Sequence, residues 1–152
     1  MKHTQMDIVP FKRVGRLVFG TKRDIVRVIL GKNFVTIPIE PGEIYTKDVY
    51  PEIDVHLEYN EDNELDHIEV GFQNRTLMFQ GINLFQKKLD DLIRMFSSFD
   101  AGLEIDELGC ISYQLGIALY CDNDEGDIDL VSIYSRDYSE AIRNFRLTGR
   151  SG

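Results

Sequence analysis

Histidine and acidic side chains alternate with apolar residues in two neighbouring stretches of the chain. In a β-strand, such alternation brings every second side chain to the same face. Imidazole and carboxylate groups are ligands that Zn²⁺ accepts, so a small metal-dependent enzyme is one interpretation of these residues. The residues concerned are Asp54, His56, Glu58, His67 and Glu69.

A hairpin that turns at residues 60–63 would place His56 opposite Glu69. In the same register, Glu58 would lie opposite His67. Pairs of this kind on an exposed sheet face contribute about 0.2–1 kcal/mol each without any ligand. The simpler interpretation is therefore an exposed row of His/Glu pairs, and we expect no metal site and no cofactor.

A second concentration of carboxylates lies at residues 122–129, between two expected strands. Its composition resembles a calcium-binding loop, in which glycine occupies the sixth position. With Gly126 at that position, Cys121 would be the first ligand and Ser132 the twelfth, and neither residue fits. The sequence therefore predicts a hairpin loop that binds no calcium.

Other catalytic signatures are missing from the sequence, and we expect a protein that is not an enzyme. There is no phosphate-binding glycine loop, no Gly-x-Ser-x-Gly turn and no Cys-x-x-Cys pair. The two cysteines, Cys110 and Cys121, are too few for a disulfide framework and predict reduced, buried thiols. A hairpin over residues 109–121 would set the two sulfurs roughly opposite each other, so a bridge in an oxidising compartment stays open.

Charge is distributed unevenly along the 152 residues, whose net charge is −9. Residues 1–32 carry +6, residues 33–135 carry −17 and the remaining tail carries +2. A field of that sign repels nucleic acid and anionic lipid and attracts basic proteins, although it also favours plain solubility. The basic first segment could contact nucleic acid, but we expect a solvated face, with Arg23 and Arg27 on the solvated side of a helix, or contact with the protein's own acidic half.

That helix is predicted from Thr21 to Gly31, with Thr21 as the N-terminal cap and Gly31 as the stop. Its apolar face is expected to hold Ile25, Val28 and Ile29. Residues 34–50 contain three interrupting Pro and Gly residues and predict irregular chain with at most an edge strand. The alternating hairpin follows, with Ile68, Val70 and Phe72 on the inner face of its second strand.

The second half of the sequence predicts a similar order of elements. Asn83 should cap a longer helix, with Gln86 completing a capping box. Strands are expected at about 109–114, 115–121 and 128–135, followed by a short C-terminal helix at 137–146.

Three short matches indicate a tandem duplication. Residues 17–19 match 77–79 at a shift of 60, 53–57 match 115–119 at 62, and 66–70 match 129–133 at 63. Chance similarity between apolar strands is the alternative.

We therefore expect an α+β fold in one domain over 1–152, with pseudo-repeats at about 12–73 and 74–135. Both main helices should cover one face of an antiparallel sheet. The other face should be solvated, acidic and open to a partner.

The N-terminal residues Met1–Asp7 are polar, and no apolar run approaches the length that a membrane span requires. A cytoplasmic location is expected.

The run from Pro10 to Gly31 resembles the opening of a group of small bacterial proteins. Residues Phe79–Leu84 and Leu115–Tyr120 fit the same resemblance, which covers most of the chain. Several such proteins are similar to immunity proteins of contact-dependent inhibition and other polymorphic toxin systems. The start and stop of the first helix also resemble the helix–strand units of β-lactamase inhibitor proteins and of a small outer-membrane assembly lipoprotein, whose signal this chain lacks.

The resemblance implies an immunity or inhibitor protein that occludes the active site of a cognate toxin. The acidic charge favours a nuclease or other basic enzyme as that partner, and neither nucleic acid nor a membrane. A small metal-dependent enzyme, centred on His56, His67 and Glu69, and a non-catalytic structural module are the alternatives. The expected partner contacts are Asp54, Glu58, Glu69, Tyr120, Asp122, Asp124, Glu125, Asp127 and Asp129.

Overall fold

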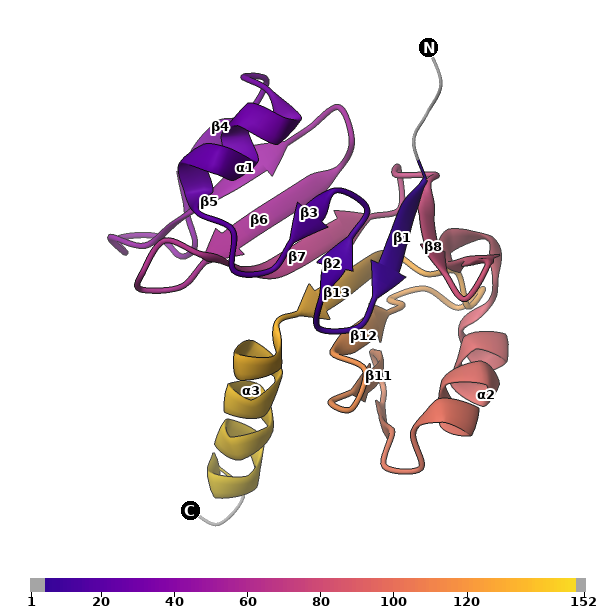
Figure 1. The fold of residues 1–152 in the computed structure, drawn as a ribbon. Coiled ribbons are helices and arrows are strands. Elements are labelled where there is room, and N and C mark those ends of the chain that lie inside the picture. The colour runs from indigo at the N-terminus through magenta and orange to yellow at the C-terminus, as the bar shows by residue number, and fades with distance from the viewer. Residues whose placement is uncertain (1–4, 150–152) are drawn as a thin grey trace.

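A computed structural model describes residues 5–149, which build two β-sheets and three α-helices. The larger sheet has eight strands in the order β10-β11-β12-β13-β7-β6-β5-β4, and every neighbouring pair is antiparallel. This confirms the α+β class and the antiparallel sheet (Figure 1). Its strands are β4 (Val35–Pro38), β5 (Thr46–Tyr50), β6 (Val55–Tyr59), β7 (Leu65–Gly71), β10 (Glu104–Asp106), β11 (Gly109–Ser112), β12 (Ile117–Tyr120) and β13 (Leu130–Tyr134).

A smaller sheet joins the two halves of the chain in the order β3-β2-β1-β8-β9. Its strand β1 runs parallel to β8, with Met6 beside Leu77. In Figure 1 the strands β1–β3 lie between helix α1 (Arg23–Leu30) and helix α2 (Leu89–Phe99). The strands are β1 (Met6–Val9), β2 (Arg13–Val14), β3 (Leu17–Val18), β8 (Leu77–Phe79) and β9 (Ile82–Asn83).

Helices α1 (Arg23–Leu30) and α2 (Leu89–Phe99) cover the same face of the large sheet. Val26 of α1 and Phe96 of α2 are fully buried in one core with inner-facing strand residues such as Leu57. This arrangement confirms the expected placement of the two main helices. Across the described part of the chain, no helix combines the length and apolar character that crossing a membrane requires.

The two four-stranded halves repeat the same strand register. Leu57 pairs with Ile68 in the first half, and Leu119 pairs with Val131 in the second, at shifts of 62 and 63. The centre of the sheet is the pairing of β7 with β13, one strand from each half. A duplication predicts this repeated register.

The proposed match at a shift of 60 does not join equivalent positions. Leu17 lies in β3, the second strand of a short hairpin, whereas Leu77 lies in β8, the first strand of one. The equivalent hairpins are β2–β3 and β8–β9. After each hairpin a lysine directly precedes the helix. The backbone of this lysine forms an isolated antiparallel β-bridge with the loop between the last two strands of its half, Lys22 with Glu64 and Lys88 with Asp127.

The apolar face predicted for α1 was wrong. Val26 is fully buried, whereas Ile25 is 50% exposed and Val28 is 80% exposed. The helix also begins one residue after Lys22, which makes no side-chain cap, rather than after Thr21. The stop was predicted correctly, since Gly31 has φ 95° and its N–H bonds to the carbonyl of Arg27 at 2.9 Å.

Residues 34–50 are more regular than expected, because they form β4 at the sheet edge and β5 inside it. Pro38 occupies the last position of the edge strand, where a missing N–H is tolerated. The irregular loop is confined to the residues between the two strands.

The second helical region differs from its prediction in where it begins. Asn83 caps only a 3₁₀ turn, Leu84–Gln86, by accepting a bond from the N–H of Phe85. Helix α2 starts afterwards, at Leu89.

The C-terminal helix α3 (Arg136–Gly149) is longer than the predicted 137–146 and lies against the second face of the sheet. Its Tyr138 and Ile142 pack on Ala118 and Tyr134. The expectation that this face is solvated and open was therefore wrong over the strands near the sheet centre.

The cysteines are buried and free, as predicted for reduced thiols. Their expected position opposite each other was wrong, because Cys110 pairs with Leu119 in the β11–β12 hairpin. Burial raises the pKa of the Cys110 thiol to about 11.

Candidate functional site

The loop between β12 and β13 is held in shape by its own polar side chains. The Asn123 carboxamide oxygen accepts bonds from the N–H groups of Glu125 at 3.0 Å and Asp127 at 3.1 Å. The Asp129 carboxylate accepts the N–H of Asp122 at 2.6 Å. The loop therefore keeps a defined shape while the side chains of Asp122, Asp124 and Glu125 are exposed.

This loop is also attached to the N-terminus of α2. The N–H of Leu89 bonds to the carbonyl of Gly126 at 2.8 Å, and the Lys88 ammonium lies 2.6 Å from the Asp127 carboxylate. Both partners of that ion pair are more than half exposed, so it adds little to stability. The attachment positions the loop, and the Lys88 ammonium partly neutralises the charge of Asp127.

A groove of about 410 Å³ lies beside the loop. Its walls include the carboxylates of Glu125, Asp127 and Asp129, the guanidinium of Arg75 and the aromatic rings of Phe72 and Phe85. Phe72 was expected on the inner face of a strand, but it follows the end of β7 and is 58% exposed. An exposed aromatic ring beside an exposed carboxylate such as Glu125 is typical of a protein-binding surface.

Asp54 lies at the same end of the sheet and has a structural role there. Its carboxylate accepts the N–H of Gln73 at 3.0 Å, and the carbonyl of Asp129 accepts the N–H of Phe72 at 3.2 Å. A Cβ at Gly71 would lie 2.2 Å from the Asp54 carboxylate, so this close packing requires glycine. Asp54 and Asp129 thus hold the segment that presents Phe72.

The cross-strand pairs predicted from the alternating stretches are present. His56 lies opposite Glu69, and Glu58 lies opposite His67. The pairs are not on an open surface, however, since His67 is only 5% exposed. Its Nδ1 lies 3.1 Å from Glu58 and its Nε2 lies 3.8 Å from Glu69.

Aromatic rings from β13 and α3 complete the surroundings of His67. The rings of Tyr134 and Tyr138 each lie 4.8 Å from the imidazole and stack on one another at 5.1 Å. The hydroxyl of Tyr120 lies 3.5 Å from that of Tyr134. Burial, with Glu58 and Asp66 nearby, raises the pKa of Tyr138 to about 12. Three of the expected partner contacts, Glu58, Glu69 and Tyr120, belong to this partly covered cluster.

Burial and neighbouring groups shift the pKa values of Glu58 and His56. Burial pushes the pKa of Glu58 upward, but His67 and the charge of Lys47 lower it below its ordinary value overall. Burial and the charge of Lys47 lower the pKa of His56. Glu58 is therefore a carboxylate at neutral pH, and His56 is an uncharged imidazole.

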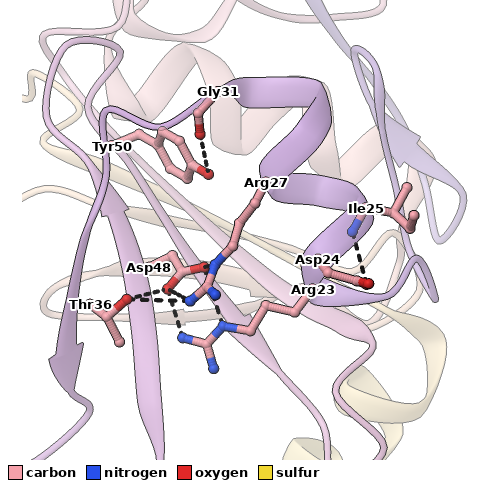
Figure 2. A network of polar contacts seen from close by, with 8 residues as sticks. All are labelled: Arg23, Asp24, Ile25, Arg27, Gly31, Thr36, Asp48 and Tyr50. Carbon is pink, nitrogen blue, oxygen red and sulfur yellow. Dashed lines mark hydrogen bonds and ion pairs between the residues drawn. The ribbon is translucent and has the colours of Figure 1, made fainter.

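A second polar network, which the sequence analysis missed, joins α1 to the sheet (Figure 2). The Asp48 carboxylate is fully buried on β5 and accepts two bonds from Arg23 and two from Arg27, at 2.7–3.2 Å. The Thr36 hydroxyl donates a further bond at 2.9 Å. Figure 2 shows both guanidinium groups pointing from the helix toward the strand. The expectation that Arg23 and Arg27 are solvated was wrong, and the alternative, contact with the acidic part of the chain, is confirmed by their ion pairs with Asp48.

These bonds fix the ionisation of Asp48. Burial alone would raise the pKa of Asp48. The hydrogen bonds from Arg27, Arg23 and Thr36 outweigh burial and lower this pKa to about 2. The only sequence signal is the spacing of Arg23 and Arg27, four residues apart on one helix face. Because donors of its own chain enclose the Asp48 carboxylate completely, the network is a structural element.

Acidic side chains gather at both ends of the sheet. The loop of residues 60–64, between β6 and β7, corresponds to the acidic loop by the repeat shift and contains exposed Glu61 and Asp62. Since β7 and β13 are antiparallel, these two loops lie at opposite ends. The nine predicted contact residues therefore do not form one surface. Six lie at the end of the sheet that holds the groove, namely Asp54, Asp122, Asp124, Glu125, Asp127 and Asp129, although only the last three of them and no other predicted contact line the groove itself, and three lie in the His67 cluster.

Comparison of the chain with protein-family models, curated proteins and solved structures finds no match.

Proposed function

We propose that this protein is a bacterial immunity protein, which binds a cognate toxin with a basic active site and blocks it. The observation that carries the proposal is the groove end of the sheet, where exposed Phe72 and Glu125 line one groove and the same loop carries the exposed carboxylates of Asp122 and Asp124. Among the described residues, these three carboxylates take part in no ion pair. They are therefore free to meet cations of a partner.

The acidic charge favours a basic partner and raises the rate of association with it. A nuclease or similar enzyme needs a positive groove to hold phosphates, and an acidic loop of fixed shape competes for that groove. The −17 charge of residues 33–135 would steer such a partner from a distance. The Phe72 ring would then supply the desolvated anchor that holds the complex together. The proposal includes a cytoplasmic location, where a toxin that acts inside the cell is met.

The experiment starts from the gene next to the coding sequence of this protein. The C-terminal domain of the neighbouring product is expressed alone and together with this protein, and viability and co-purification are measured. We expect toxicity alone and protection by a stable complex. A neighbour that is harmless and does not bind contradicts the proposal.

The site is tested with charge-matched variants. The triple variant Asp122→Asn, Asp124→Asn, Glu125→Gln should lower the association rate by about tenfold or more at low salt. The control Glu40→Gln, Glu43→Gln, Glu61→Gln removes the same charge from exposed positions away from the groove and should change the rate much less. Equal effects of the two variants would show that only net charge matters.

Phe72→Ala tests the anchor separately. Because this ring is exposed in the free protein, its removal should leave stability within about 0.5 kcal/mol. It should increase the dissociation rate of the complex, by an amount typical of an aromatic hot spot, about 2 kcal/mol. An unchanged dissociation rate would remove Phe72 from the interface.

A further inference from the structure

The imidazole of His67 is buried without any hydrogen bond to either ring nitrogen. Its exposure is 5%, and neither Nδ1 nor Nε2 has a hydrogen-bond partner among the described residues. A neutral imidazole always carries one N–H donor and one acceptor, and burying such a group unpaired is unfavourable. A ligand that binds a ring nitrogen would remove that cost.

Two carboxylates lie beside this ring at distances that suit a shared metal ion. One ligand atom from each of Glu58, His67 and Glu69 lies within 4.8 Å of the others. Zinc holds nitrogen and oxygen ligands at about 2.0–2.2 Å, so two of its ligands lie about 3–3.5 Å apart. The 3.1 Å separation of Glu58 from Nδ1 falls in this range.

The nature of that contact also matters. Although the two atoms are 3.1 Å apart, His67 Nδ1 has no hydrogen-bond partner among the described residues. In a metal site the ion lies on the lone pair of the ring nitrogen, and the neighbouring carboxylate oxygen lies to the side of it. Two ligands of one metal therefore approach each other closely without a hydrogen bond between them.

We propose that Glu58, His67 and Glu69 form a binding site for one divalent transition-metal ion of the Zn²⁺ class. One imidazole and two carboxylates supply three protein ligands, and water completes the shell. The presence of an imidazole disfavours Mg²⁺ and Ca²⁺, which prefer all-oxygen sites. The Glu69 side chain is 24% exposed, so its carboxylate is free to turn toward an ion held by the other two ligands.

The aromatic rings give the metal a structural consequence. Tyr134 and Tyr138 hold the imidazole on two sides, and Tyr138 belongs to α3. Fixing the ring by a metal bond therefore stabilises the attachment of α3 to the sheet. This inference is independent of the toxin partner, because the site lies in a different cluster from the groove.

The test uses the full chain, freed of metal with a chelator and then titrated with ZnSO₄ in a calorimeter. We expect one zinc per chain, retained through dialysis, and a higher melting temperature than the metal-free protein. CaCl₂ at the same concentration should produce neither effect. No retained zinc and an unchanged melting curve would overturn the proposal.

Three variants locate the site. His67→Gln, Glu58→Gln and Glu69→Gln should each weaken zinc binding more than about tenfold. His56→Gln removes the neighbouring imidazole outside the three-ligand cluster and is the matched control, with binding expected to remain. Zinc binding that survives His67→Gln, or that is lost equally in His56→Gln, would contradict the assignment.

A direct spectroscopic reading protects the test against variants that fold poorly. The ¹⁵N signals of the imidazole nitrogens in the wild-type protein should shift for His67 on addition of zinc, with one nitrogen affected far more than the other. Shifts confined to another histidine would overturn the assignment without any substitution.

Discussion

At the scale of single residues, Asp48 has the most demanding environment in the molecule. Its carboxylate has no exposure, and two guanidinium groups and one hydroxyl neutralise it. Rings complete the enclosure, since Tyr59 lies 4.8 Å from the Arg23 guanidinium and Phe34 lies 4.6 Å from that of Arg27. A buried charge of this kind is stable only while all its partners are present.

The substitution Asp48→Asn keeps the side-chain volume and removes the charge. It leaves both arginines without their shared counter-ion and should cost about 3 kcal/mol of unfolding free energy. This is the lower end for a buried pair, because the Arg27 side chain is 34% exposed. Urea unfolding measures the loss. A cost below 1 kcal/mol would mean that water replaces the carboxylate.

The same residue predicts acid sensitivity. Its pKa is lowered from 3.8 to about 2 on folding, so its contribution is complete above pH 4 and is lost as the pH falls toward 2. The contribution is about 2 kcal/mol, from the size of the shift. Stability measured between pH 5 and pH 2 should fall less steeply in Asp48→Asn. The exposed Glu61→Gln is the control and should leave the slope unchanged.

At the scale of elements, helix α1 presents a polar pair to the sheet and part of its aliphatic side to solvent. Arg23, Val26 and Arg27 face inward, whereas Val28 is 80% exposed. The residue pattern of this helix gives it one aliphatic face and one basic face. Hydrophobicity alone predicts that the aliphatic face is buried against the sheet. Asp48, which decides the orientation, lies 21 residues beyond Arg27 in the sequence.

A pair of matched substitutions tests this orientation. Val26→Ala should cost about 2 kcal/mol because it empties a fully buried position. Val28→Ala, on the same helix, should change stability by less than about 0.5 kcal/mol. Chemical unfolding of both variants gives the comparison. A larger loss of stability for Val28→Ala than for Val26→Ala would support the apolar face predicted from the sequence.

Helix α3 is held by few contacts, and Tyr138 makes the central one. Tyr138→Ala removes the ring stacked on His67 and Tyr134 and should cost about 2 kcal/mol. It should also expose α3 to proteolysis earlier than the rest of the chain. Phe145→Ala, on the same helix but 75% exposed, is the control and should alter neither property. Limited proteolysis followed by mass spectrometry identifies the first cleavage site.

How far the sequence predicts the structure depends on how local the deciding interaction is. The β6–β7 hairpin was predicted in register, including His56 opposite Glu69, because alternation and a short turn determine it locally. The burial of His67 was not predictable, since the covering Tyr138 lies far along the chain. For the same reason the acidic loop was found, but its exposed neighbour Phe72 was missed.

At the scale of the whole molecule, the two halves share one continuous sheet and one core. Five residue pairs join β7 to β13, and the parallel pair β1–β8 joins the halves a second time. The core cluster runs through both halves without interruption. We therefore expect the repeats to unfold together, in spite of their internal similarity.

The thiols allow a measurement of this cooperativity. Cys110 and Cys121 are 5% and 7% exposed and lie in the second half only. Their reaction with a thiol reagent should appear at the same urea concentration at which the β6 amide protons of the first half begin to exchange globally. Thiol labelling at lower urea would show that the second half opens by itself.

The two outermost strands of the large sheet determine how another chain can approach it. Strand β4 is four residues long and ends in Pro38, and β10 has three residues, with the carboxylates of Glu104 and Asp106 and the guanidinium of Arg146 beside them. Short, charged or proline-containing borders discourage backbone pairing with a foreign strand. The sheet is thus protected against growth into fibrils, and any binding partner must recognise side chains and loops instead of extending the ladder.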